Sequence, residues 1–151
     1  MAALPAKYVG LSPCGPTKAD MARVLLIEDN PLNRKLTTLV LRTAGHVVIH
    51  AVDAESGLEK ARAELPDLIL MDIQLPGMSG LEATQLLKKE VATSSIPVIA
   101  ITALAMKGDP ERIAAAGCDG YIAKPIRYEQ LWNVIEKYVI KASADSTQDS
   151  K

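Results

Sequence analysis

Aromatic side chains are scarce in this sequence, which has no phenylalanine and only four tyrosines and one tryptophan among 151 residues. So few rings exclude base-stacking platforms and aromatic cages, which need several rings side by side. The formal net charge of -1 removes the attraction that would bring nucleic acid or an anionic membrane to the chain. We therefore expect neither partner, and a core of aliphatic side chains.

Cysteines and long apolar runs are also nearly absent. Cys14 and Cys118 are the only cysteines, and they form no metal-type cluster with each other. A reducing, cytoplasmic setting is the default for such a chain. No apolar run is long enough for the hydrophobic region of a signal peptide or for a membrane span.

The two ends of the chain differ in composition from its middle. Residues 1–20 contain three prolines and two glycines, and the last ten residues are small and polar. Such segments bury too little apolar surface to fold alone. We expect a flexible leader over 1–20, a single domain over 21–141 and a flexible tail over 142–151.

Five short apolar runs alternate with helical patterns through the middle block. Continuous apolar runs are typical of strands that helices cover on both faces. The five runs are 24–27, 46–52, 68–71, 98–101 and 120–123. Repeated strand-then-helix units with short connections predict an α/β domain with a doubly wound parallel sheet.

The helical stretches also predict which side chains lie on one face. After a cap at Asn30 and Pro31, one helical face carries Leu32, Leu36, Leu39, Val40 and Thr43. A later helix should turn Leu81, Leu87 and Val91 inward. Trp132 falls outside the apolar stripe of the last helix, so core packing and contact with a partner protein both remain open.

Polar side chains follow four of the five runs. Glu28 and Asp29 follow the first, Asp72 the third, Thr102 the fourth and Lys124 the fifth. Because sites in open α/β sheets form outside the carboxyl ends of the strands, these groups should converge on one edge. Each of them alone is more simply a helix cap or a solvated strand end, and only the set indicates a site.

The chemistry of this set points to phosphoryl transfer. Clustered carboxylates repel one another unless a cation sits among them, and Mg²⁺ accepts one or two carboxylates while keeping positions for phosphoryl oxygens. Lys124 and Thr102 suit those oxygens as donors. A carboxylate beside a metal and a lysine can accept a phosphoryl group as an aspartyl-phosphate. No nucleotide-binding glycine loop follows the first run, so the group must come from elsewhere.

Signature segments of bacterial response-regulator receiver domains resemble four stretches of this chain: LLIEDN, LILMDIQLPGMSG, VIAITA and YIAKPI. The resemblance covers residues 21–141. It implies a flavodoxin-like fold, in which a five-stranded parallel sheet of order 2-1-3-4-5 is flanked by five helices.

The resemblance also implies roles for particular residues. Asp72 matches the phospho-acceptor, Thr102 the switch hydroxyl, Tyr121 the switch aromatic and Lys124 the invariant lysine, whose bond to Pro125 is cis in the family. Mg²⁺ would be held directly by Asp29 and Asp72, through a water by Glu28, and by the backbone carbonyl of Gln74.

Partners follow from the same resemblance. A sensor histidine kinase or a histidine phosphotransfer protein would donate the phosphoryl group, as part of a two-component or phosphorelay pathway. Thr102 would then move toward the phosphate and Tyr121 would turn inward, changing the face that binds a downstream protein. That face comprises the fourth helix, the fifth strand and the fifth helix.

Three functions are compared at this point. The first is a stand-alone receiver, since the chain ends after the fifth helix. Such a protein is not an enzyme beyond a slow autodephosphorylation. In the family, the rate of dephosphorylation is tuned at the positions of Gln74 and Leu104. The second is an aspartate-nucleophile phosphohydrolase, but many of these carry a second Asp where this chain has Gln74. The third is a degenerate receiver that has lost the site. The complete set of acids, hydroxyl and lysine argues against it.

Overall fold

A five-stranded parallel sheet forms the middle layer of the computed structural model, which describes residues 22–103, 109–124, 126–127 and 129–138. The strand order is β2-β1-β3-β4-β5, as predicted. The strands are β1 (Arg23–Ile27), β2 (Val47–Ala51), β3 (Leu68–Asp72), β4 (Val98–Thr102) and β5 (Gly120–Ala123). Each lies within a residue or two of its predicted run.

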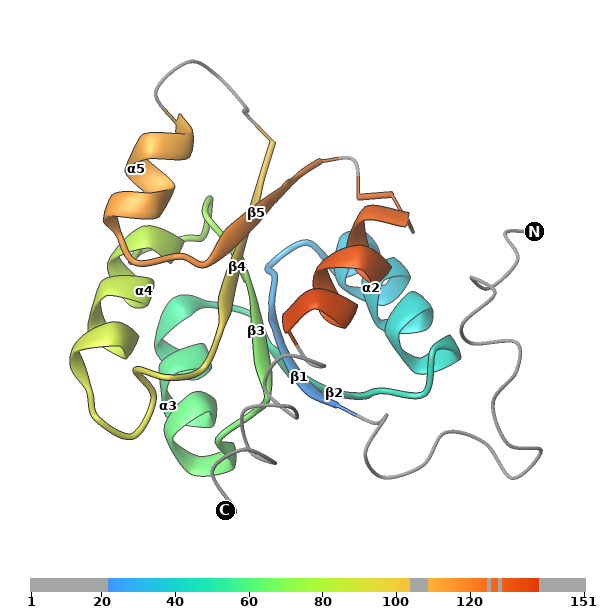
Figure 1. The fold of residues 1–151 in the computed structure, drawn as a ribbon, viewed down its shortest axis with the longest axis horizontal. Helices are drawn as coiled ribbons and strands as arrows, with labels where there is room; N and C mark the ends of the chain where they lie inside the picture. Colours follow the sequence, from blue (N-terminus) through green and yellow to red (C-terminus); the bar gives the residue numbers. More distant parts are fainter. Residues whose placement is uncertain (1–21, 104–108, 125, 128, 139–151) are drawn as a thin grey trace.

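Helices cover both faces of this sheet (Figure 1). On one face lie α3 (Ala54–Glu64), α4 (Gly80–Lys89) and α5 (Asp109–Ala115). On the other lie α2 (Pro31–Thr43) and a last helix over 129–138. Asn30 and Asp53 cap α2 and α3 by accepting backbone N–H groups, as their sequence positions predict. The doubly wound α/β fold is therefore confirmed.

The core consists of two aliphatic layers, one on each face of the sheet. Val40 and Leu41 of α2 pack with Leu131 and Ile135 of the last helix on one side. Helices α3 and α4 supply Leu58, Ala61, Ala83 and Leu87 on the other. Trp132 is only 4% exposed and belongs to the first layer, so packing accounts for it rather than partner contact.

Most of the predicted apolar face of α2 is wrong, because only Val40 of its five residues is buried. Leu32, Leu36 and Leu39 are 64%, 51% and 61% exposed, and the buried residues are Thr37, Thr38, Val40 and Leu41. Threonine can replace leucine on the inner face because its hydroxyl can bond to the helix backbone; that of Thr38 donates to the carbonyl of Arg34 at 2.6 Å. The leucine stripe is therefore left on the surface.

A second correction concerns the end of α4. Val91 was expected to point inward, but it is 93% exposed. The helix ends at Lys89 and Glu90 is extended, so Val91 no longer follows the helical repeat. Leu87, one of the other two residues of that predicted stripe, is fully buried.

Polar contacts join several elements at the amino ends of β4 and β5. Lys88 Nζ donates to the carbonyl of Ile96 at 2.8 Å and to Asp119 Oδ2 at 3.0 Å. The same Asp119 oxygen accepts the N–H of Val98, and the Asp119 carbonyl accepts the Tyr138 hydroxyl at 2.6 Å. Helix α4, both strands and the last helix are thereby tied together, and we call this group the Lys88 cluster.

Some sequence predictions fall outside the described residues. These are the leader and the tail, Cys14, Leu104, and the geometry of the Lys124–Pro125 bond. Within the part of the chain that is described, no helix combines the length and hydrophobicity needed to cross a bilayer.

Candidate functional site

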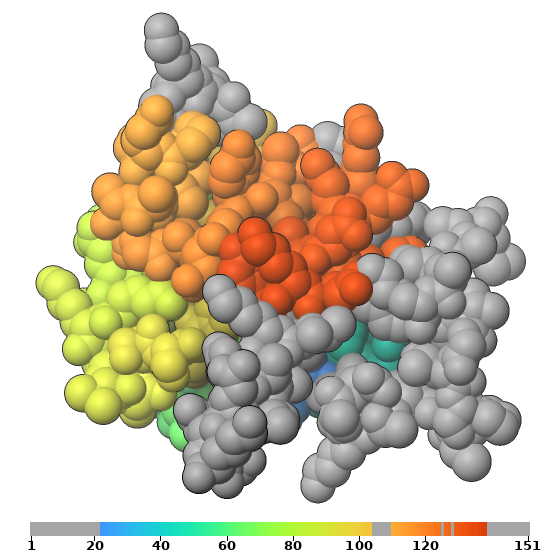
Figure 2. Space-filling model, in the orientation of Figure 1, coloured from blue at the N-terminus to red at the C-terminus, as the bar shows by residue number. Residues whose placement is uncertain are grey.

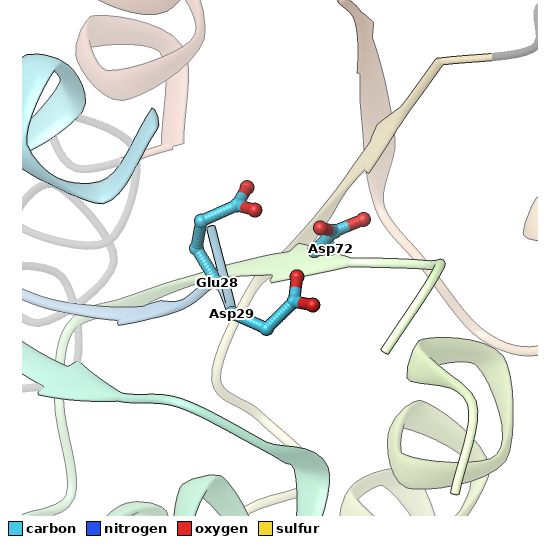
Figure 3. A group of neighbouring side chains, drawn as sticks. All are labelled: Glu28, Asp29 and Asp72. Carbon is cyan, nitrogen blue, oxygen red and sulfur yellow. The ribbon is translucent and has the colours of Figure 1, made fainter. Parts of the chain in front are cut away.

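Three carboxylates meet where β1 and β3 end. Glu28 and Asp29 follow β1, and Asp72 is the last residue of β3. One carboxylate oxygen from each of the three residues lies within 4.8 Å of the other two (Figure 3). Glu28 and Asp72 are 1% and 2% exposed, whereas Asp29 is exposed. The convergence predicted from the strand ends is therefore present in the structure.

Lys124 lies among these acids, directly after β5. Its Nζ is 3.1 Å from Asp72 Oδ2 and 3.4 Å from Glu28 Oε2. Burial disfavours the charged amine, but the hydrogen bond and charge of Asp72 and the charge of Glu28 outweigh it and raise the pKa of Lys124. One ammonium thus faces two buried carboxylates.

Backbone N–H groups hold one oxygen of each buried acid. The N–H of Gln74 donates to Asp72 Oδ1 at 3.0 Å, and that of Asn30 donates to Glu28 Oε1 at 3.2 Å. Glu28 Oε2 is buried and accepts no hydrogen bond from any described residue, although Lys124 is near. A buried carboxylate oxygen that accepts no hydrogen bond, beside two other carboxylates, fits a hard divalent cation such as Mg²⁺.

Burial and the neighbouring Asp72 both disfavour the ionised form of Glu28. Burial raises the pKa of this carboxyl to about 7, and the neighbouring Asp72 acts in the same direction. The charge of Lys124 and the N–H of Asn30 lower it only in part. The site is therefore short of positive charge at neutral pH.

Thr102 and Tyr121 occupy different environments. Thr102 ends β4 next to Ile101, the residue paired with Asp72, and it is buried. Its carbonyl accepts the N–H of Lys124 at 2.7 Å, which places both residues at the site edge of the sheet. Tyr121 lies on the outer strand β5, and its ring is 45% exposed, so this conformation leaves it accessible.

Gly80 belongs to the site, although the sequence reasoning did not identify it. It begins α4, and its N–H donates to the carbonyl of Ile73 at 3.0 Å. A Cβ atom here would overlap the carbonyl oxygen of Asp72 and lie 2.9 Å from Ile73 Cα. One feature of the sequence could have identified it. Gly80 is a second glycine shortly after Gly77 of the Pro76-Gly77 turn, and it begins a helix, where most other residues would stabilise the helix more than glycine does.

Removing the buried charge of Glu28 should stabilise the metal-free protein. The pKa of Glu28 is near 7 in the folded protein and near 4.5 in the unfolded chain. Between pH 4.5 and pH 7 the folded protein therefore binds more protons than the unfolded chain, and the free energy of unfolding falls as the pH rises through this range. The free energy of unfolding of Glu28→Gln should not fall in this way, because glutamine does not ionise. We expect its melting temperature in EDTA to exceed the parent's by roughly 5–10 °C at pH 8 and to match it near pH 4.5.

Glu111→Gln serves as a control, because Glu111 is exposed and the charge change is the same. Its difference from the parent should be equal at both pH values. A lower melting temperature of Glu28→Gln at pH 8 would mean that Lys124 stabilises the ionised carboxylate, contrary to this account.

The model of the response regulator receiver domain family matches residues 24–136. The chain therefore belongs to the response-regulator receiver-domain family. Within the family, the stretches DLILMDIQLP and AMKGDPERIAAAGCDGYIAKPI resemble the cell-division regulator DivK, and comparison with curated proteins confirms this likeness. The polar-differentiation response regulator DivK of Brucella anthropi is 47% identical over 116 residues, covering 77% of this chain and 94% of that protein.

Solved structures give the same family. The receiver domain of the sensor histidine kinase PA1611 from Pseudomonas aeruginosa has a TM-score of 0.74 and 33% identity, over 78% of this chain and 97% of that chain. That structure contains a magnesium ion coordinated in its active-site cleft. Chemotaxis response regulator CheY4 of Vibrio cholerae has a TM-score of 0.74 and 26% identity, over 78% and 98% of the two chains.

Proposed function

We propose that this receiver domain accepts a phosphoryl group on Asp72 and signals through phosphorylation-dependent contact with another protein. The observation that carries the proposal is the setting of Asp72. It is buried at a strand end, between the ammonium of Lys124 and the N–H of Gln74, with two further carboxylates beside it. A structural aspartate needs no such neighbours.

The acids fit Mg²⁺ as the cofactor. Asp29 and Asp72 would hold it directly, Glu28 would act through a bound water, and the Gln74 carbonyl would complete the protein ligands. When bound, the metal supplies positive charge to phosphoryl oxygens. The buried Glu28 oxygen that accepts no hydrogen bond and the magnesium ion in the PA1611 receiver support this assignment.

The donor is a phosphohistidine on a histidine kinase or a histidine phosphotransfer protein, as in a two-component or phosphorelay pathway. A carboxylate oxygen of Asp72 attacks phosphorus, a P–O bond forms and the P–N bond breaks, and the imidazole leaves with the electron pair. Lys124 remains within reach of the new phosphate and offsets its charge.

The response to phosphorylation passes through Thr102 and Tyr121. The Thr102 hydroxyl moves toward the phosphate, and the accessible Tyr121 ring turns inward in a shift between two pre-existing states. Helix α5, strand β5 and the last helix lie along one stretch of surface (Figure 2), and this stretch is the proposed contact for the downstream partner.

A phosphohydrolase of the aspartate-nucleophile type is less well supported. Such an enzyme commonly places a second Asp two residues after the nucleophile to protonate the leaving group. That position is Gln74 here, whose side chain cannot supply a proton at neutral pH. Receiver domains are phosphoacceptors, and we propose only slow loss of the phosphoryl group by hydrolysis.

The proposal is tested by labelling with acetyl phosphate, followed by intact-mass measurement. We expect one phosphoryl group per molecule in the presence of Mg²⁺ and none in EDTA. Beryllofluoride, a phosphoryl mimic, should likewise bind to the protein only when Mg²⁺ is present. Continuous release of phosphate from a generic ester would favour the hydrolase, and equal labelling in EDTA would contradict the metal assignment.

A further inference from the structure

Helix α2 carries charge of one sign only. Its thirteen residues contain Arg34, Lys35 and Arg42 but no Asp or Glu. By contrast, α3 combines three glutamates with a lysine and an arginine, as solvent-exposed helices commonly do. Since the whole chain has a net charge of -1, the three cations of α2 form a local excess.

These cations line a groove between α2 and the edge strand β2. The groove has a volume of about 510 Å³, and His50 of β2 forms part of its wall. It lies on one side of α2, and a second hollow, next to Lys124 and Ile126, lies along a different set of α2 residues. The two are lined by different residues, and Lys124 belongs only to the second.

Among the residues that the structure describes, no acid neutralises the groove. None of its lining residues is acidic, and no ion pair joins Lys35 or Arg42 to any carboxylate of the described residues. Arg34 donates to a backbone carbonyl, that of Glu28, at 3.0 Å. Burial, followed by the charges of Arg34, Arg42 and Lys60, lowers the pKa of His50, in keeping with a field of one sign.

Apolar surface lies between the charges. Leu39 is 61% exposed and lines the groove together with Pro31. The wall is ordered, because Thr38 Oγ1 is 2.8 Å from His50 Nε2 and donates to the Arg34 carbonyl. An exposed leucine flanked by unpaired cations is suited to a surface that is apolar and acidic at once.

The spacing of the cations indicates the shape of the occupant. Arg34 and Arg42 are eight residues apart, which corresponds to about 12 Å along a helix. A single phosphate cannot reach both ends. A helix lying along α2 can, with acidic residues two turns apart and an apolar residue between them.

We propose that the groove between α2 and β2 binds an acidic amphipathic helix of a partner protein. Its carboxylates pair with Arg42 and with Lys35 or Arg34, and its apolar side chain covers Leu39.

The test uses a fluorescent alanine-based helical peptide with leucines on one face and two glutamates eight positions apart on that face. A matched peptide carries glutamines instead. In fluorescence anisotropy we expect the glutamate peptide to bind at least about tenfold more tightly. Arg42→Gln should weaken its binding about fivefold, and Leu39→Ser should also weaken it.

Lys89→Gln is the control, because Lys89 is likewise exposed and lies in the last turn of a helix, on the opposite face of the sheet. It should bind the peptide as the parent does. Equal weakening by both variants, or equal binding of both peptides, would overturn the proposal. So would a short DNA duplex that binds with the same dependence on Arg42, since the groove would then recognise phosphates. Acetyl phosphate labelling of Arg42→Gln stays normal, which separates this test from that of Asp72.

Discussion

Asp72→Asn should abolish labelling by acetyl phosphate while leaving the fold intact. Asparagine keeps the shape of the side chain and can still accept the N–H of Gln74, so the strand end should be preserved. The amide oxygen of asparagine is a poor nucleophile, and the substitution removes one of the two carboxylates that Lys124 contacts. The measurement is intact mass after incubation with acetyl phosphate and Mg²⁺, together with a thermal melt.

The melt should show equal or slightly higher stability, because one of three crowded carboxylates has been removed. Asp53→Asn is a matched control: it makes the same substitution at a helix cap, a position that asparagine also serves well. This control should be labelled like the parent. Full labelling of Asp72→Asn would show that the acceptor lies elsewhere.

Gly80→Ala should impair both stability and phosphorylation. The added Cβ would overlap the carbonyl oxygen of Asp72 and press on the backbone of Ile73, and neither group can move as a flexible side chain does. Overpacking against backbone should reduce the free energy of unfolding by about 3 kcal/mol. The displaced Asp72 should also be labelled more slowly, which a time course with acetyl phosphate measures.

Gly57→Ala separates the two effects. Its Cβ would meet the side chain of Ile27, with Cγ1 at 2.8 Å, in the core rather than at the site. We expect a loss of about 1–2 kcal/mol in the free energy of unfolding and a normal labelling rate. If Gly80→Ala were labelled at the parental rate, the close approach of α4 would have no part in positioning Asp72.

Sheet and site could be predicted from the sequence because both depend on local signals. Apolar runs of four to seven residues mark buried parallel strands, and the polar residues that follow must share one edge. Glu28, Asp29, Asp72 and Lys124 are therefore brought together by topology alone. Their spacing in the chain carries no such information without the strands between them.

The errors arose where packing depends on distant residues. The leucines of α2 outnumber its threonines, but the face that packs against β1 and β2 contains Thr37 and Thr38, and the Thr38 hydroxyl bonds to the helix backbone. The closeness of Gly80 to Asp72 depends on how α4 returns to the sheet. Likewise, the buried His46 accepts the N–H of Ala22 through Nδ1, a contact between residues 24 positions apart that no periodicity reports.

The Lys88 cluster joins β4 and β5 at the end of the sheet opposite the site. It holds β4 and β5 together at their amino ends, whereas Thr102 and Lys124 follow the same strands at their carboxyl ends. If Asp72 is phosphorylated as proposed, a displacement at the carboxyl ends of β4 and β5 would be restrained at their amino ends, and the strands would pivot rather than translate. The Tyr138 hydroxyl bond attaches the last helix to the same restrained end.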